Sequence, residues 1–161
     1  MIGPGDRLPE AALVEKQDDG PIRVDLTGLL KGRKVIVFGV PGAFTPTCSS
    51  AHLPSFVRAA DRLRQKGVDE ILCLSLNDVH VMRLWGEQSG AIAAGIRMLA
   101  DSDGALARAM GLAWSNPDVG FHDRFRRFAM LVEDTTVAAF HLDDMGVCAS
   151  TTGEAMLAEL K

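Results

Sequence analysis

Cys48 is the residue best placed for chemistry in this 161-residue chain. It lies in a loop that follows the apolar, β-branched run 34–40 and precedes an amphipathic segment. Sites in α/β proteins are built in such loops between a strand and a helix. If the helix begins near Thr47, the sulfur lies in its first turn, where unpaired N–H groups and the helix dipole favour an anion. This position favours a thiolate, which is the nucleophilic form of cysteine.

Two further residues favour a catalytic role for Cys48 over that of a small buried apolar residue, which free cysteines often have. Thr45 lies three residues before it, between two prolines, and offers a hydroxyl that can donate and accept hydrogen bonds. Arg127 shares a predicted strand face with Ala129 and Leu131, and an arginine among inward-facing residues needs an anion such as a thiolate. An isolated arginine would more often form a surface ion pair, so spacing alone does not single out Arg127.

Strands and helices alternate along the chain in the manner of an α/β domain. The first strand, a helix that ends at Gly67 and a second apolar strand form a βαβ unit, and Pro54 predicts a kink or break early in that helix. Glu133-Asp134 is predicted to be the turn of a β-hairpin. The predicted elements are strand 34–40, helix 53–66, strand 69–77, helix 79–87, strand 96–99, helix 104–110, strands 127–132 and 135–142, and a C-terminal helix from Thr151 or Thr152.

These elements predict one domain over residues 1–161, with a central mixed β-sheet flanked by helices. An apolar content of 47% is sufficient for the core of such a domain. The 17 basic and 21 acidic residues are scattered, which argues against a nucleic-acid partner. The longest stretch without a strongly polar residue, 35–44, is shorter than the roughly 20 residues that a bilayer requires. The first residues lack the apolar core of a signal peptide, so we expect a cytoplasmic protein without a membrane partner.

The three cysteines, Cys48, Cys73 and Cys148, fit neither a disulfide scaffold nor the spacing of zinc ligands. His52 lies four residues after Cys48 and raises the possibility of a cysteine hydrolase, although no third orienting group is evident. The other histidines are scattered, and the sequence predicts no metal site. They are His80, His122 and His141.

Residues 38–49, Phe-Gly-Val-Pro-Gly-Ala-Phe-Thr-Pro-Thr-Cys-Ser, resemble the active-site segment of the peroxiredoxins. The similarity is to the subfamily that contains animal peroxiredoxin V and plant type II peroxiredoxins. It covers nearly the whole chain in order, and the twelve-residue segment together with the later arginine is highly specific. Further matches lie at 52–56, 73–78, Trp85, 99–101 with Gly104, 126–130, and a glycine-containing turn before the C-terminal helix.

The resemblance implies a thioredoxin-like fold and a thiol peroxidase that reduces hydrogen peroxide and organic hydroperoxides. Cys48 would be the peroxidatic cysteine and Pro41 would shield it. Thr45 would bind the peroxide oxygens, while Arg127 would hold the thiolate and polarise the peroxide. No cofactor is implied. The resemblance also implies a homodimer with its contact near the active-site loop, and the aromatic residues Phe44, Phe121 and Trp85 would belong either to the core or to that contact.

The sulfenic acid formed on Cys48 must then be reduced by another thiol. Cys73 matches the second cysteine of the plant type II enzymes, but its apolar neighbours predict burial, and a disulfide needs Cα atoms within about 7 Å. Cys148 lies near the resolving cysteine of animal peroxiredoxin V, displaced by about two residues because that cysteine falls nearer Ser150. The remaining alternative is a one-cysteine mechanism, with glutaredoxin and glutathione, or thioredoxin, as the reductant.

Two hypotheses from other classes remain open at this point. The first is a noncatalytic thioredoxin-fold redox sensor that uses oxidation of Cys48 as a switch. The second is a cysteine hydrolase, which would perform acyl transfer and require His52.

Overall fold

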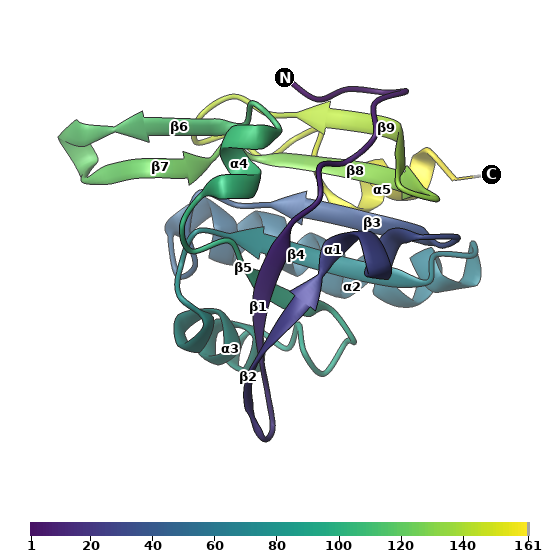
Figure 1. Cartoon of the computed structure of the whole chain (residues 1–161), viewed down its shortest axis with the longest axis horizontal. Helices are drawn as coiled ribbons and strands as arrows, with labels where there is room; N and C mark the ends of the chain where they lie inside the picture. The colour runs from purple at the N-terminus through teal and green to yellow at the C-terminus, as the bar shows by residue number, and fades with distance from the viewer. Residues whose placement is uncertain (161) are drawn as a thin grey trace.

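The computed structural model describes residues 1–160, and it is built around a seven-stranded mixed β-sheet (Figure 1). The strand order is β2-β1-β5-β4-β3-β8-β9. Strands β3, β4 and β5 run parallel to one another, and the remaining pairs are antiparallel. The strands are β1 (Ala12–Gln17), β2 (Gly20–Asp25), β3 (Lys34–Gly39), β4 (Glu70–Ser75), β5 (Arg97–Ala100), β8 (Phe128–Glu133) and β9 (Thr136–Leu142).

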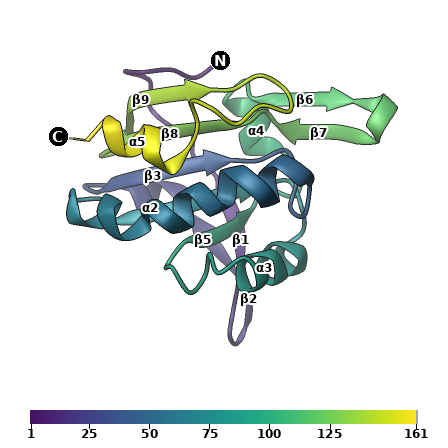
Figure 2. The same cartoon turned by 180° about the vertical axis from the view of Figure 1, so that it is seen from behind.

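Helices cover both faces of this sheet. Helices α2, α3 and α5 lie on one face, which is turned to the viewer in Figure 2, while α1 and α4 lie on the other. The predicted α/β domain with a mixed sheet flanked by helices is therefore confirmed. The helices are α1 (Leu26–Leu30), α2 (Leu53–Gln65), α3 (Val79–Gln88), α4 (Ala105–Ala109) and α5 (Gly153–Ala158).

The central strand β3 is buried on both faces because its alternate side chains enter two different cores. Ile36 and Phe38 pack with α2, α3 and α5, whereas Val35 and Val37 pack with α1 and α4. A parallel strand with both faces covered needs a continuous apolar run, and residues 35–38 supply one. Cys48 belongs to the core cluster of Ile36 and Phe38, so this face of the sheet carries the candidate site.

The chain turns helical at residues 46–47, so Cys48 lies in the first turn, as predicted. A π-helical turn, η1 (Cys48–His52), then precedes α2, and the Leu53 N–H donates to the Cys48 carbonyl. Pro54 has no N–H to donate, and its ring would clash with the carbonyl four residues earlier in a regular α-helix. The structure has a widened turn before this proline where the sequence predicts a kink or break.

The C-terminal hairpin has its turn one residue later than predicted. Glu133 pairs with Thr136, and Asp134 and Thr135 form the turn with positive φ angles of 46° and 71°. Two-residue hairpin turns of this hand match the twist of the strands, and aspartate tolerates the left-handed region better than most residues. The Gly32 N–H donates to the Asp134 side chain at 2.7 Å, which fixes the turn against the loop before β3.

Three parts of the fold have no counterpart in the sequence prediction: the β1–β2 hairpin, α1, and a two-stranded ribbon. The ribbon consists of β6 (Ala113–Asn116) and β7 (Phe121–Phe125), joined by the 3₁₀ turn η2 (Pro117–Val119). It projects beyond the main sheet in Figure 1. Most residues of β2 and β7 are exposed or half-buried, so these strands lack the apolar periodicity from which strands are predicted.

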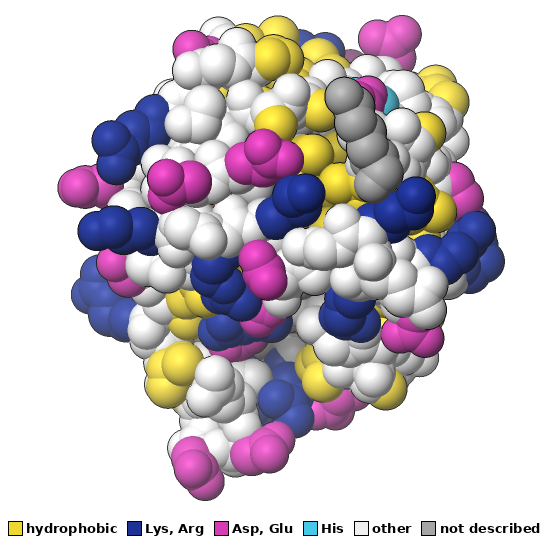
Figure 3. All heavy atoms as spheres, turned by 90° about the vertical axis from the view of Figure 1, so that its right-hand side faces the viewer, with side chains coloured by type: hydrophobic (Ala, Val, Ile, Leu, Met, Phe, Trp, Pro, Cys, Tyr) yellow, Lys and Arg dark blue, Asp and Glu magenta, His cyan; other side chains and the backbone are white. Residues whose placement is uncertain are grey.

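The surface carries charge of both signs without a patch of either sign on the face shown in Figure 3. Within residues 1–160 no helix has the length and apolar character needed to cross a membrane. The same part of the chain holds no group of three or more histidine, cysteine or acidic side chains arranged to bind a metal ion.

We expect Gly153→Ala to destabilise the protein, because α5 packs closely on α2 at this position. A Cβ there would lie 2.5 Å from the Ser55 carbonyl oxygen and 2.9 Å from the Ala59 Cβ, and the backbone atom cannot move aside. Overpacking of this kind typically costs about 1–3 kcal/mol. Urea unfolding would measure the loss. The matched control is Gly3→Ala, where a Cβ meets nothing within 4 Å. Equal stability of the two variants would contradict the packing.

Candidate active site

Strand pairing brings Arg127 to Cys48 across 79 positions of the sequence. Gly39, the last residue of β3, pairs with Phe128, the first residue of β8. Arg127 therefore lies beside the point where β3 gives way to the loop that carries Cys48. Its Nη2 donates a hydrogen bond to the Cys48 Sγ at 3.2 Å. The structure thus places Arg127 against the sulfur, on the core face of β8 to which Ala129 and Leu131 also belong. The alternative of a surface ion pair is wrong.

Both partners of this contact are buried: Cys48 has no exposed surface and Arg127 is 4% exposed. Among residues 1–160 no carboxylate lies within ion-pair distance of Arg127. A buried guanidinium charge without a counter-charge is strongly unfavourable. The thiolate form of Cys48 supplies that counter-charge, so the contact favours the reactive form of the cysteine.

His52 holds the other end of the Arg127 guanidinium. The Arg127 Nη1 lies 3.0 Å from the His52 Nδ1, and the His52 Nε2 lies 2.9 Å from the Thr151 carbonyl oxygen. A carbonyl only accepts, so Nε2 carries the proton and Nδ1 is the acceptor for Arg127. Burial, reinforced by the nearby Arg127 charge, lowers the pKa of His52 to about 3, and the ring is neutral at physiological pH.

This geometry does not support the cysteine hydrolase hypothesis. A hydrolase histidine must take a proton from the nucleophile, with its other nitrogen oriented by a third group. Here Arg127 bonds to the sulfur, and both nitrogens of His52 are engaged by Arg127 and Thr151. The sequence showed that His52 lies four residues after Cys48, but it gave no sign of the contact with Arg127 or of the role of Thr151.

Thr45, Pro41 and Arg127 line one cavity of about 200 Å³. The Thr45 hydroxyl donates to the Gly42 carbonyl at 2.6 Å, so towards a ligand its oxygen is available as an acceptor. The Arg127 Nε is buried and has no hydrogen-bond partner among the described residues. The other residues around the cavity come from the active-site loop, the β6–β7 ribbon and the segment after β9: Pro46, Thr47, Trp114, Asn116, Val119, Phe121, Met145 and Gly146.

Two residues that the sequence did not single out fix the loop at 41–45. The Arg124 Nη1 donates to the Pro41 carbonyl at 3.0 Å, and the Asn77 side-chain oxygen accepts from the Ala43 N–H at 2.8 Å. A Cβ at residue 42 would lie 2.8 Å from the Arg124 Nη1, so a larger residue than Gly42 would displace the guanidinium that holds Pro41. The match at 73–78 contained Asn77, but nothing in the pattern indicated which loop it would hold.

Asp143 fixes the segment that leads from β9 to α5. Its carboxylate accepts from the backbone N–H groups of Ala149, Ser150 and Thr151, and from the hydroxyls of Ser150 and Thr151. Burial alone would raise the pKa of Asp143, but these hydrogen bonds outweigh it and hold the pKa well below its usual value. The carboxylate is therefore charged at physiological pH, and it keeps Thr151 in place beside His52.

The three cysteines are all free, and the other two have environments unlike that of Cys48. Cys73 lies in β4 opposite Phe38 and is fully buried, and burial together with the nearby Cys48 raises the pKa of its thiol. Cys148 is half-buried, with its Sγ 4.0 Å from the Thr151 hydroxyl oxygen, and burial raises its thiol pKa as well. The expected burial of Cys73 is confirmed.

The aromatic residues near the loop differ in exposure. Trp85 is 2% exposed and its Nε1 donates to the Ser49 hydroxyl at 3.1 Å, so it belongs to the core. Phe44 is 49% exposed and has a positive φ of 63°. Phe121 is half-buried and packs edge-on against Trp114 in the β6–β7 ribbon.

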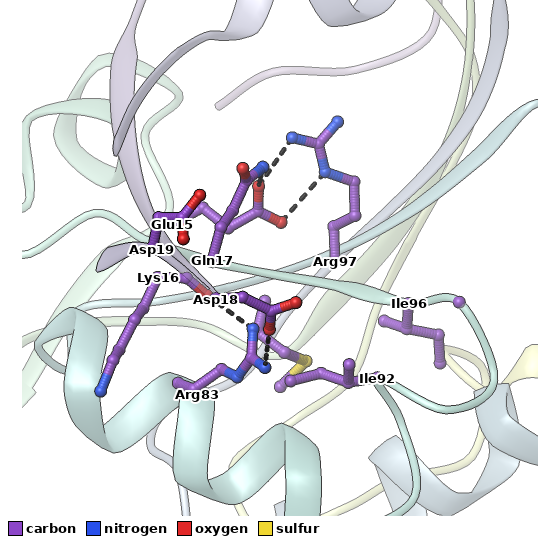
Figure 4. Close-up of a pocket in the computed structure, with 11 residues that line it drawn as sticks. Glu15, Lys16, Gln17, Asp18, Asp19, Arg83, Ile92, Ile96 and Arg97 are labelled. Atoms are coloured by element: carbon purple, nitrogen blue, oxygen red, sulfur yellow. Dashed lines mark hydrogen bonds and ion pairs between the residues drawn. The ribbon is translucent and has the colours of Figure 1, made fainter. Parts of the chain in front are cut away.

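A second hollow, of about 450 Å³, lies between β1, β5 and α3, away from Cys48 (Figure 4). Two arginines face it, and each is paired within the chain. Arg97 forms two hydrogen bonds with Glu15, at 3.0 and 2.7 Å, and Arg83 bonds to Asp18 at 2.9 Å. Because both guanidinium charges are matched by carboxylates, this hollow offers a ligand much less than the cavity lined by Pro41, Thr45 and Arg127 does.

The chain matches the redoxin family model over residues 3–155. It is 42% identical to peroxiredoxin-2E-2, chloroplastic, of Oryza sativa subsp. japonica, over 99% of this chain and 72% of that protein. It is 38% identical to peroxiredoxin-2C of the same species, over 99% and 98%. The structure of reduced Prx3 from Vibrio vulnificus in complex with hydrogen peroxide superposes with a TM-score of 0.93 at 39% identity, and the match covers all of both chains. The chain therefore belongs to the redoxin family, within which it is a peroxiredoxin with a thioredoxin-like fold.

Proposed function

We propose that this chain reduces hydrogen peroxide and organic hydroperoxides at Cys48, with an external thiol returning the cysteine to its reduced form. Peroxiredoxins are thiol-dependent peroxidases of antioxidant defence and redox homeostasis, and this chain is one of them. The observation that carries the proposal for this site is the buried hydrogen bond from Arg127 to the Cys48 sulfur. It pairs a nucleophile with a cation beside a cavity that is large enough for a small substrate.

The first step transfers one peroxide oxygen to the sulfur. The thiolate attacks the terminal oxygen of the hydroperoxide, the O–O bond breaks, and the other oxygen leaves as alkoxide or hydroxide, which takes up a proton. Cys48 is oxidised to the sulfenic acid and the peroxide is reduced to alcohol or water. Negative charge moves from sulfur to the leaving oxygen, so fixed donors along that line stabilise the transition state.

Arg127 and Thr45 supply complementary hydrogen bonds in this proposal. The buried Arg127 Nε lacks a partner among the described residues and is available to donate to a peroxide oxygen. The Thr45 oxygen, whose own proton goes to Gly42, accepts from the peroxide O–H. Pro41, fixed by Arg124, lines the same cavity and limits the access of water to the sulfur.

Organic hydroperoxides fit the apolar part of the cavity wall. Trp114, Phe121, Val119 and Met145 line it, and Val119 and Met145 are 61% and 53% exposed. An alkyl group that covers these side chains removes apolar surface from water, at about 25 cal/mol per Å². Hydrogen peroxide has no alkyl group and makes no such contact. Both substrates are proposed, and the organic hydroperoxide makes the larger contact with the cavity wall.

Regeneration by an external thiol is favoured by the way the chain holds its other two cysteines. Cys73 is fixed within the sheet, and the segment that carries Cys148 is held by the hydrogen bonds of Asp143. A first thiol, from glutaredoxin with glutathione or from thioredoxin, condenses with the sulfenic acid to a mixed disulfide and water. A second thiol then displaces Cys48 as a thiolate. Cys148 is the internal alternative, because it lies in the connection from β9 to α5, next to the Thr151 that holds His52.

We also propose a homodimer and a cytoplasmic location. Phe44 supports the dimer, because it is a half-exposed aromatic side chain on the active-site loop, where a second copy would cover it. Three free thiols support a reducing compartment. Cell fractionation with an antibody to the chain would test the location, and the chloroplastic relative from Oryza sativa makes a plastid the other compartment to examine.

Peroxide consumption in the presence of dithiothreitol tests the proposed activity. We expect the wild type to consume hydrogen peroxide and an alkyl hydroperoxide, and Cys48→Ser to fall to the rate without protein. Arg127→Lys keeps the charge but loses the forked donor, and we expect a fall of about 100-fold. A wild type no faster than Cys48→Ser would contradict the proposal and favour the redox-sensor hypothesis, in which Cys48 oxidises without turnover.

Intact-mass analysis after one equivalent of peroxide tests the route of regeneration. We expect a gain of one oxygen on Cys48, which glutathione converts to a mixed disulfide. A loss of two hydrogens would instead indicate an internal disulfide. If that loss vanishes in Cys148→Ser, Cys148 resolves Cys48, and if it vanishes in Cys73→Ser, Cys73 does so. Either result would contradict direct regeneration by an external thiol.

Sedimentation equilibrium tests the dimer. We expect the wild type to be dimeric at micromolar concentration and Phe44→Ser to shift the equilibrium towards monomer by about tenfold in dissociation constant, the effect of removing one buried aromatic contact. Ile22→Ser is the control, because Ile22 is 41% exposed on β2 at the far edge of the sheet. A monomeric wild type, or an equal effect of both substitutions, would contradict this interface.

A further inference from the structure

We propose that His52 is a positioning residue for Arg127, and that it makes the reactivity of Cys48 depend on the docking of the segment before α5. The observation behind this is a continuous series of buried hydrogen bonds from the Thr151 carbonyl through His52 and Arg127 to the Cys48 sulfur. This proposal rests on the proposed function, which assigns Cys48 as the reacting thiol. His52 holds Arg127, the partner of that thiol.

The direction of each hydrogen bond in this series is set by the one before it. The Thr151 carbonyl can only accept, which places the proton of the neutral imidazole on the His52 Nε2. The His52 Nδ1 is then an acceptor, and it takes a hydrogen bond from the Arg127 Nη1 at 3.0 Å. Because the pKa of His52 is about 3, the imidazole is neutral and this arrangement is intact at physiological pH.

The planar shape of the guanidinium transmits this restraint to the sulfur. Nη1 and Nη2 belong to one rigid fork, so fixing Nη1 on His52 also fixes the direction in which Nη2 meets the Cys48 Sγ. Without the acceptor on His52, Nη1 would join Nε as a second buried donor without a partner. The guanidinium would then turn towards other acceptors, and its charge would stabilise the thiolate less.

Two routes connect His52 to the residues at the start of α5. Its side chain donates to the Thr151 carbonyl, and its own carbonyl accepts from the Ser55 hydroxyl at 2.6 Å. That Ser55 oxygen accepts from the Gly153 N–H at 2.9 Å. Asp143 holds Thr151 from the other side, through its N–H at 3.1 Å and its hydroxyl at 2.7 Å. The position of residues 151–153 therefore affects both the side chain and the backbone carbonyl of His52.

The rings around His52 restrict the rotation of the imidazole. Phe38 and Phe56 lie with ring centroids 5.1 and 5.6 Å from it, and no part of His52 is exposed. A side chain held in this way acts as a rigid spacer between the Thr151 carbonyl and Arg127. Movement of Thr151 is therefore transferred to the guanidinium and is not absorbed by rotation of the ring.

Two substitutions at His52 separate its two hydrogen bonds. In His52→Asn the side-chain oxygen occupies the place of Nδ1, so the acceptor for Arg127 is kept and the bond to Thr151 is lost. In His52→Gln we expect the longer amide to donate to Thr151, which carries its oxygen away from the place of Nδ1 and so away from Arg127. The readout is the pH dependence of alkylation of Cys48 by iodoacetamide, followed for the Cys48 peptide by mass spectrometry. This measurement does not depend on peroxide turnover.

We expect the midpoint of the alkylation profile to move to higher pH in His52→Gln, because a misplaced Arg127 favours the thiolate less. The alkylation rate at pH 7 should fall about tenfold, which corresponds to about 1.4 kcal/mol. We expect the alkylation rate of His52→Asn to stay within about threefold of the wild-type rate, since this variant keeps the acceptor for Arg127. A wild-type profile in His52→Gln, with the fold intact by circular dichroism, would overturn the proposal.

Thr151→Val tests the connection to α5 without altering any charge. It removes the hydroxyl by which Asp143 anchors Thr151 and keeps the shape of the side chain. We expect it to slow the alkylation of Cys48 about threefold in the wild type and to have little further effect in His52→Asn, where the side-chain route from residue 52 to Thr151 is already broken. Contacting residues that act through one another are non-additive in this way. Equal effects of Thr151→Val in both backgrounds would overturn the proposed coupling.

The arms of this experiment also separate the proposal from the proposed function. If both His52 variants fail to fold, Thr151→Val in the wild type decides, and an unchanged alkylation profile there overturns the proposal. If the wild type consumes no peroxide but His52→Gln shifts the alkylation profile, the positioning role of His52 stands and the peroxidase assignment of this site fails.

Discussion

The buried positive charge of Arg127 is the constraint around which the site is built. At 4% exposure the guanidinium receives little stabilisation from water, and its partners are a sulfur and a neutral histidine nitrogen. Removing one partner of a buried charge pair typically costs 3–5 kcal/mol. No carboxylate lies within ion-pair distance of Arg127 among the described residues, so the sulfur is the group in contact with the guanidinium that can carry the counter-charge.

The π-helical turn before α2 carries both partners of the Arg127 guanidinium. Cys48 and His52 are four residues apart, so on a helical turn they lie on the same face. The turn contains one extra residue because Pro54 follows it and cannot donate a backbone hydrogen bond. Widened turns of this kind are frequent at functional sites. Here the proline, which the sequence presents as a kink or break early in the helix, directly follows the turn that carries the two side chains that receive Arg127.

Much of the site could be predicted from the sequence because its key parts are local. Residues 41–48 form one loop between β3 and η1, and the apolar run before it marks the strand. Arg127 was found through a resemblance, since no local pattern relates it to a cysteine 79 positions away. The pairing of Thr151 with His52 was not predicted, because a backbone carbonyl leaves no trace in the sequence. The β1–β2 hairpin and the β6–β7 ribbon were missed because one strand of each, β2 and β7, is largely exposed or half-buried and has no apolar periodicity.

The odd number of cysteines is explained by the different surroundings that the fold gives to them. Cys73 and Cys48 belong to one apolar core cluster, yet only Cys48 has a cation beside it. Burial without that cation raises the pKa of the Cys73 thiol, so at neutral pH it is protonated and is a poor nucleophile. Burial also raises the thiol pKa of Cys148, although the Thr151 hydroxyl and Arg127 oppose the rise. A thiol in that state attacks a sulfenic acid slowly until its segment opens and water restores its ordinary acidity. The hydrogen bonds of Asp143 that keep residues 149–151 in place thus hold Thr151 against His52 and, by the same contacts, hold the segment that carries Cys148.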